Sequence, residues 1–218
     1  MNLLRKLISA SILTLAIFIP LTSQAAIVAG KDYQVLNVPM GTDSGKKIEV
    51  AEFFWYSCSH CFHLEPGLNQ WIKTMPKDAK IRRIPAVLRD TWVPLAKAYY
   101  AMEAMGVVNK YHDALFNAIH MDNMVIEKDN DLFDWAVKAG MNKSAFMSAY
   151  QSFSVQSKVL RANQLIREAQ ITGVPAFVVD GKYMTTISMT GSEAALFATL
   201  NELIIKARKE HAQTAKHK

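Results

Sequence analysis

The chain has 218 residues, of which 50% are hydrophobic, and a formal net charge of +6. This charge lies at the two ends: Arg5 and Lys6 precede residue 26, and residues 206–218 carry a net +4, so the body between them is formally neutral. The composition therefore gives no basic surface for nucleic acid, and we expect no nucleic-acid partner. The length suits one hydrophobic core with an insertion.

Residues 1–25 have the pattern of a secretory signal peptide. Arg5 and Lys6 form a positive start, Leu7–Ile19 an apolar stretch, and Ser23-Gln-Ala25 a small-x-small cleavage site. The apolar stretch is short for a transmembrane helix and is followed by Pro20. We therefore expect export from the cytosol, to a compartment where a disulfide can persist.

Two strands are predicted next. Tyr33–Leu36 indicates a short first strand and 43–47 a turn, and Ile48–Phe54 is an apolar, aromatic-rich run typical of a buried central strand. Glu52 lies inside this strand, flanked by apolar residues. The strand pattern alone allows it to be an outward-facing carboxylate.

The two cysteines of the chain, Cys58 and Cys61, follow where a helix is predicted to begin. A disulfide closing so short a loop stabilises the fold little, and its tight geometry favours reduction, so the pair suits redox chemistry. Unpaired N–H groups and the positive dipole end of the helix favour a thiolate at Cys58. Cys61 should lie one turn further in and be less exposed. His60 can add a hydrogen bond or a positive charge near Cys58, or it is an ordinary solvated histidine.

Two other uses of this segment fit less well. Cys58, His60, Cys61 and His63 could all ligate zinc, but four ligands within six residues can hardly surround one ion tetrahedrally. Covalent haem attachment requires a histidine directly after the second cysteine, where Phe62 stands. We expect no metal, and no cofactor other than a redox-active Cys58–Cys61 disulfide.

Further strands and a run of helices follow. Pro66 should kink or divide the helix that carries the cysteines, and 79–87 is predicted as a third strand. Four short amphipathic helices are then predicted from the stripes Trp92, Leu95, Tyr99, Met102; Val108, Tyr111, Leu115, Ile119; Leu132, Phe133, Ala136; and Phe146, Tyr150, the last capped by Asn142. A longer helix over 155–169, a hairpin of 176–179 with 182–185 and a last helix capped by Ser192 complete the chain, and 206–218 is predicted to be a flexible basic tail.

Two motifs far apart carry a resemblance to a known family. Glu52-Phe-Phe-x-x-x-Cys-x-His-Cys61 and Thr172-Gly-Val-Pro-Ala-Phe-Val-Val-Asp-Gly-Lys-Tyr183 resemble the DsbA family of periplasmic thiol oxidases of Gram-negative bacteria. The resemblance runs from about residue 33 to the C-terminal helix. It implies an α/β thioredoxin fold with an inserted helical domain: a thioredoxin-like domain of 26–87 and 155–205, and an insert of 88–154.

The resemblance also implies roles for single residues. Val174–Pro175 would be a cis peptide beside the cysteines, with Val174 offering backbone groups to an extended substrate peptide. Glu52 would be a buried acid that exchanges a proton with Cys61 and pairs with Lys80. A solvated lysine at a strand end is the alternative for Lys80.

The implied activity is donation of the Cys58–Cys61 disulfide to newly exported proteins with free thiols. We expect a periplasmic monomer that a DsbB-like inner-membrane protein reoxidises. A disulfide isomerase or reductase of the same fold, a non-redox peptide-binding module and a glutathione-dependent transferase are the alternatives. The chain before the first strand is short for an isomerase's dimerisation domain, binding alone needs neither cysteine, and such transferases would carry a serine instead. Ser59 stands where the family's best-known members have proline, which leaves the redox potential open.

Overall fold

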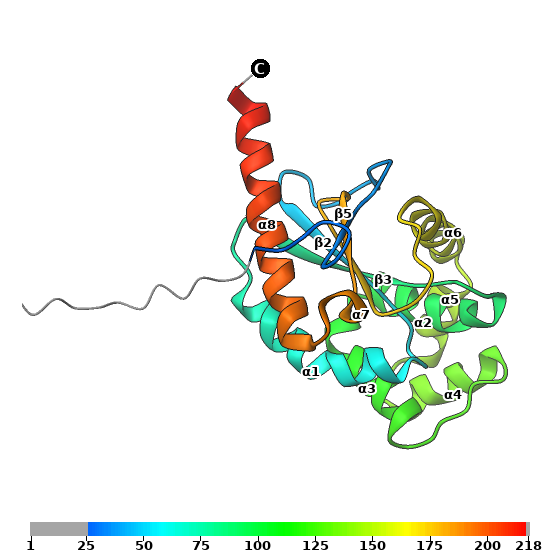
Figure 1. The fold of residues 1–218 in the computed structure, drawn as a ribbon. Coiled ribbons are helices and arrows are strands. Elements are labelled where there is room, and N and C mark those ends of the chain that lie inside the picture. The colour runs from blue at the N-terminus through cyan, green and yellow to red at the C-terminus, as the bar shows by residue number, and fades with distance from the viewer. Residues whose placement is uncertain (1–25, 217–218) are drawn as a thin grey trace, which may run out of the picture.

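The computed structural model describes residues 26–216 (Figure 1). The expected signal peptide, residues 1–25, lies outside this part of the chain. Within residues 26–216, no helix is both long enough and apolar enough to cross a membrane.

A five-stranded mixed sheet with the order β1-β5-β4-β2-β3 forms the centre of the fold. Its strands are β1 (Gln34–Val35), β2 (Ile48–Phe54), β3 (Ala79–Pro85), β4 (Ala176–Val179) and β5 (Tyr183–Thr185). Strand β2 runs parallel to β3 and antiparallel to β4, and all of its residues are buried. Coverage on both faces explains why β2 is an apolar run rather than an alternating one. The strands lie where the sequence predicts them.

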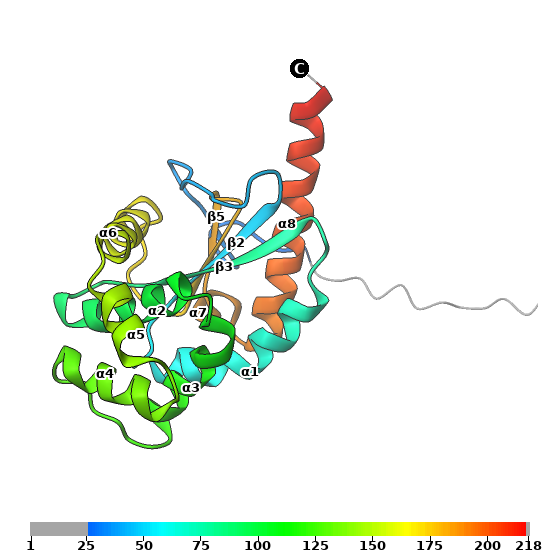
Figure 2. The same cartoon turned by 180° about the vertical axis from the view of Figure 1, so that it is seen from behind.

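Helices cover both faces of this sheet (Figures 1 and 2). Helices α1 (Ser59–Thr74) and α8 (Glu193–Lys216) pack on one face, where Val50 and Phe177 point. On the other face, where Ala51 and Val178 point, α2 (Val93–Ala104) and α6 (Phe153–Glu168) contact β3. Helices α3 (Val108–His120), α4 (Asp129–Lys138) and α5 (Lys143–Tyr150) contribute to the same core. Short helices η1 (Asp90–Trp92) and α7 (Ile187–Thr190) precede α2 and α8. The side-chain alternation of the strands thus divides the interior into two cores.

Predicted helix ends agree with the structure at two caps and differ at one proline. The Asn142 side chain accepts the Ala145 N–H at 2.9 Å, and the Ser192 hydroxyl accepts the Ala195 N–H at 3.1 Å. These are the expected N-caps of α5 and α8. Pro66 lies inside α1, which continues to Thr74, so it does not divide the helix.

The expected flexible tail is wrong over residues 206–216, because α8 continues through them. Glu210 accepts a hydrogen bond from the Tyr183 hydroxyl in β5. Arg208 forms an ion pair with Asp78, in the turn before β3, at 2.6 Å. Arg208 and Glu210 therefore have partners far away in the sequence, which composition alone does not reveal.

Candidate active site

Cys58 is the N-cap of α1 and joins it to the central strand. Its N–H donates to the Trp55 carbonyl at 3.0 Å, which closes a turn directly after β2. Its sulfur accepts the backbone N–H of Cys61 at 3.4 Å, one of the first-turn groups that have no partner within the helix. Both cysteines are free thiols; Cys58 is half-buried and Cys61 only 1% exposed.

The two thiols have opposite pKa shifts. Hydrogen bonds from the Cys61 thiol, and from the backbone N–H groups of Cys61 and His60, lower the pKa of Cys58 to about 6 although burial opposes them. The charge of the exposed His60 acts in the same direction and more weakly. Burial, followed by the hydrogen bond to Cys58, raises the pKa of Cys61. At neutral pH the pair is therefore a reactive thiolate beside a protonated thiol.

Val174 and Pro175 border the other side of the Cys58 sulfur. The Val174–Pro175 peptide bond is cis, and the Cys58 sulfur lies 3.5 Å from the Val174 carbonyl oxygen. A cavity of about 430 Å³ adjoins them, lined by His60 and by side chains from residues 170–176 and 184–188. The Cys58 sulfur therefore lies next to a groove at the start of β4, where Val174 and Pro175 form part of the wall.

Glu52 is buried in β2, and its partner is Arg83 on β3. The Arg83 Nε atom donates to Glu52 Oε2 at 3.0 Å. Burial raises the pKa of Glu52 to about 7, although the charge of Arg83 opposes this. The second oxygen of Glu52 has no hydrogen-bond partner among residues 26–216. The charge of Glu52 contributes to the raised pKa of Cys61, so the acid is close enough to act on that thiol.

The expected pairing of Glu52 with Lys80 is wrong. In the parallel register of β2 with β3, Lys80 lies opposite Glu49, and Arg83 lies opposite Glu52. Lys80 is exposed, whereas Arg83 is mostly buried. The two basic residues are three positions apart, so they point to opposite faces of the strand.

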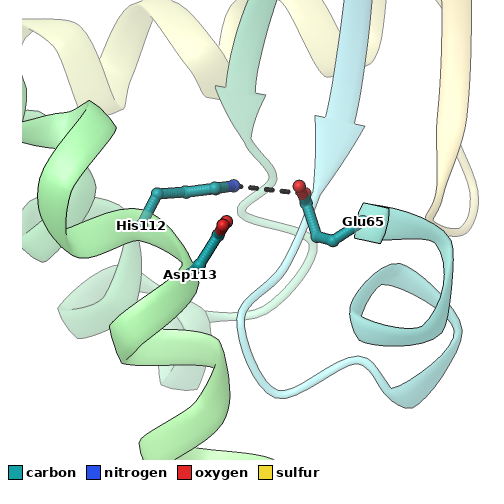
Figure 3. Close-up of side chains that lie close together, drawn as sticks. All are labelled: Glu65, His112 and Asp113. Atoms are coloured by element: carbon teal, nitrogen blue, oxygen red, sulfur yellow. Dashed lines mark hydrogen bonds and ion pairs between the residues drawn. The ribbon is translucent and has the colours of Figure 1, made fainter. Parts of the chain in front are cut away.

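The buried charges extend from Glu52 to the helical insert. Arg83 donates through Nη2 to Glu65 Oε2 in α1 at 2.7 Å, and His112 Nε2 in α3 lies 3.1 Å from Glu65 Oε1 (Figure 3). Burial raises the pKa of Glu65 to about 7 and, with help from the charge of Arg83, lowers that of His112 to about 3. The contact between Glu65 and His112 is thus a hydrogen bond from a neutral imidazole rather than an ion pair.

Figure 3 also shows Asp113 of α3 beside these two groups. The ligand atoms of Glu65, His112 and Asp113 lie within 4.8 Å of one another, a spacing compatible with a metal ion. The Arg83 guanidinium already binds Glu65, however, and its charge would repel a cation. We therefore interpret Glu65 and His112 as members of a hydrogen-bond network with Arg83 rather than as metal ligands.

Sequence reasoning missed Arg83, Glu65 and His112. Glu65 offered a signal, because it follows Cys61 by four residues and therefore shares its face of the helix. Arg83 cannot be preferred over Lys80 without the strand register. His112 lies beside the predicted apolar stripe of α3, where a histidine would usually be read as a surface residue.

The sheet order, a cysteine pair at the start of the helix after the central strand and a proline beside it define a thioredoxin-like thiol:disulfide oxidoreductase. The family model of the DSBA-like thioredoxin domain matches residues 89–197. The chain is 36% identical over 204 residues to the thiol:disulfide interchange protein DsbA of Burkholderia cepacia, which covers 92% of this chain and 96% of that protein.

Solved structures agree with this match. The crystal structure of Pseudomonas aeruginosa DsbA has a TM-score of 0.81 at 34% identity and covers 84% of this chain and 96% of that one. Reduced DsbA1 from Neisseria meningitidis has a TM-score of 0.77 at 27% identity, covering 87% and 100%. The chain belongs to the DsbA family, and the predicted thioredoxin fold with inserted helices is confirmed.

Proposed function

We propose that the protein is a periplasmic thiol oxidase that transfers its Cys58–Cys61 disulfide to newly exported proteins with free thiols. The observation that carries the proposal is the inequality of the two thiols: the pKa of the accessible Cys58 falls to about 6, and that of the buried Cys61 rises. A stabilised Cys58 thiolate stabilises the reduced enzyme. The disulfide is then a strong oxidant, because reducing it is favourable.

Disulfide transfer takes two exchange steps. A substrate thiolate attacks the Cys58 sulfur of the oxidised enzyme, the Cys58–Cys61 bond breaks, and Cys61 leaves with the electron pair. Cys61 then takes up a proton, which we assign to Glu52, since the pKa of Glu52 of about 7 lets it carry one near neutral pH. A second substrate thiolate attacks the substrate sulfur of the mixed disulfide and releases Cys58 as a thiolate. Two electrons pass from the substrate dithiol to the enzyme.

The groove beside Cys58 is our candidate for the substrate site. Val174 borders the Cys58 sulfur at 3.5 Å through its carbonyl, so its backbone is next to the reacting atom. An extended peptide that pairs with Val174 would place a substrate cysteine against Cys58. Pro175 has no N–H of its own to offer at this point.

The completed cycle requires a reoxidant. We propose a DsbB-like, quinone-linked inner-membrane protein that accepts the two electrons from reduced Cys58 and Cys61. Export through residues 1–25 as a signal peptide, a monomeric state and the absence of any cofactor besides the cysteine pair belong to the same proposal. The thiol:disulfide interchange proteins among the relatives support it.

Equilibration of the purified protein with glutathione redox buffers tests the proposal. The fraction of reduced enzyme is measured by trapping its thiols with a maleimide and resolving the two forms by mass. We expect the enzyme to be mostly reduced even in buffers with a large excess of oxidised glutathione. A pair that stays oxidised until reduced glutathione is in large excess would instead indicate a thioredoxin-like reductase.

A further inference from the structure

Tyr56 lies in the turn that connects strand β2 to the N-cap Cys58. It is the first central residue of the turn that Cys58 closes by donating to the Trp55 carbonyl. Its side chain is 1% exposed, so contacts inside the protein determine the orientation of this residue and of the turn. Any rotation of Tyr56 would move the N-cap that places the Cys58 sulfur.

The hydroxyl of Tyr56 is bound by His112 of α3. The Tyr56 oxygen lies 2.8 Å from His112 Nδ1, and the opposite ring nitrogen, Nε2, lies 3.1 Å from Glu65. Arg83 also binds Glu65, which favours its ionised, accepting form. A neutral imidazole has a single N–H, so Nε2–H donates to Glu65 and Nδ1 accepts from the Tyr56 hydroxyl. His112 thereby joins the residues on either side of the cysteine pair.

The backbone of Tyr56 is bound by a second histidine of the same helix. His120 Nε2 lies 2.7 Å from the Tyr56 carbonyl oxygen, and a carbonyl only accepts, so this nitrogen carries the proton. The His120 ring stacks on Phe62, directly after Cys61, with centroids 4.7 Å apart and planes 12° apart. Phe116, between the two histidines, packs its ring 4.8 Å from that of Tyr56.

From these contacts we infer that His112 and His120 are positioning residues that hold Tyr56 by its hydroxyl and its carbonyl, so that helix α3 of the insert fixes the reactivity of the Cys58 sulfur. The two histidines are eight residues apart, about two helical turns, and reach Tyr56 from one face. Helices α1 and α3 are in direct contact, so a shift of α3 acts on the turn before Cys58. The inference rests on the proposed function in taking Cys58 as the attacking sulfur.

The variants can separate the individual hydrogen bonds. His112→Asn keeps an acceptor near the Nδ1 position for Tyr56, whereas His112→Gln keeps a donor near Nε2 for Glu65 and loses the acceptor. His120→Phe keeps a ring on Phe62 and loses the N–H, and His120→Gln restores a donor. His63→Gln is the matched control, because His63 lies on α1 next to Phe62, is exposed, and makes no hydrogen bond to Tyr56.

The readouts are the pKa of the Cys58 thiol, from thiolate absorbance against pH, and its rate of alkylation by iodoacetamide at pH 5. We expect His112→Gln and His120→Phe to raise this pKa by about half a unit, which lowers the thiolate fraction at pH 5 about threefold. His112→Asn, His120→Gln and His63→Gln should stay close to the parent protein. Thermal melting is measured in parallel for every variant.

A fall in melting temperature with an unchanged Cys58 pKa in both His112→Gln and His120→Phe would overturn the inference, because the histidines would then be ordinary packing residues. Tyr56→Phe, which loses only the hydroxyl, serves if His112→Gln fails to fold, and an unchanged pKa there overturns the His112 contact. These readouts require only the Cys58 thiol. The glutathione equilibrium of the parent protein tests the oxidase separately, so the two ideas can fail independently.

Discussion

The two sides of the cysteine pair differ in kind. On the groove side, His60 is exposed, Val174 is half-buried, and a cavity of about 430 Å³ adjoins the Cys58 sulfur. On the insert side, Glu52, Glu65 and His112 are buried; Arg83 joins Glu52 to Glu65 by hydrogen bonds, and Glu65 bonds His112. Exchange through a mixed disulfide needs both: one sulfur that partners can reach, and a second that leaves into an enclosed environment.

The insert side also holds two acids whose pKa values are raised toward neutral. Two carboxylates, Glu52 and Glu65, share one guanidinium, and burial raises both pKa values to about 7. The network is electrically balanced when one of the two acids is protonated, because His112 is neutral. A proton held near neutral pH next to Cys61 is what a leaving thiolate requires.

The largest effect on activity should come from removing either sulfur, because the accessible and the buried cysteine have different tasks. Cys58→Ser is expected to abolish oxidation of a model dithiol peptide, because the sulfur that substrates attack is gone. Cys61→Ser should keep a reactive Cys58 and accumulate mixed disulfides, since the intramolecular thiol that releases trapped partners is missing. Non-reducing gels and mass spectrometry of the adducts check both. Residual turnover in Cys58→Ser would assign the nucleophile to the wrong cysteine.

The largest effect on stability should come from replacing Arg83. Arg83→Met leaves Glu52 and Glu65 buried without their shared guanidinium, and we expect a loss of about 3 kcal/mol in the free energy of unfolding at pH 8. The loss should shrink at pH 5, where both carboxyls are protonated and carry no charge to compensate. Urea unfolding at the two pH values measures it.

Lys80→Met is the matched control for Arg83→Met. Lys80 lies on the same strand and is exposed, so its loss should change the unfolding free energy by less than about 0.5 kcal/mol. Equal losses in the two variants would contradict the pairing of Glu52 with Arg83.

The groove side could be predicted from the sequence, whereas on the insert side only the buried acid Glu52 was expected, from the family resemblance, and its partners were not. Cys58, His60 and Cys61 lie within four residues after a recognisable strand, so local pattern places them together. The choice between Lys80 and Arg83 depends on the register of two strands that a whole helix separates, and a single sequence does not specify it. His112 and His120 lie on a helix that was predicted, but their contacts to Tyr56 arise only when α3 packs on α1.

The difference in stability between the reduced and the oxidised protein should depend on pH, and this effect should be smaller than that of Arg83→Met. The pKa of Cys58 is about 6 in the folded protein and ~8.5 in the unfolded chain. The Cys58 thiolate therefore stabilises the folded, reduced protein, fully so at pH values above the unfolded pKa. This stabilisation is lost as the pH falls through about 6. The disulfide has no proton to titrate, and its entropic benefit is small for so short a loop.

We therefore expect the reduced protein to melt above the oxidised protein at pH 8, with the gap shrinking by about 1–2 kcal/mol at pH 5 once solvent screening of a half-buried thiol is allowed for. Measurements stay at or below pH 8, because the raised pKa of Cys61 acts against the reduced form at higher pH. Calorimetry of both forms measures the gap. An oxidised form that is the more stable at pH 8 would favour a reductase.

The smallest effect on the pKa of Cys58 should come from the exposed His60 on the groove side. Its charge is the weakest of the influences that lower the pKa of Cys58, behind the hydrogen bonds from Cys61 and from the helix start. His60→Ala should therefore raise this pKa by only about 0.3 unit at low salt, and 1 M NaCl should remove the difference, because salt screens charges between exposed groups. Thiolate absorbance against pH measures it, with His63→Ala as control. A rise of more than about one unit in the pKa of Cys58, insensitive to salt, would contradict this prediction. It would mean that His60, rather than the hydrogen bonds at the helix N-terminus, is the main source of the stabilised thiolate.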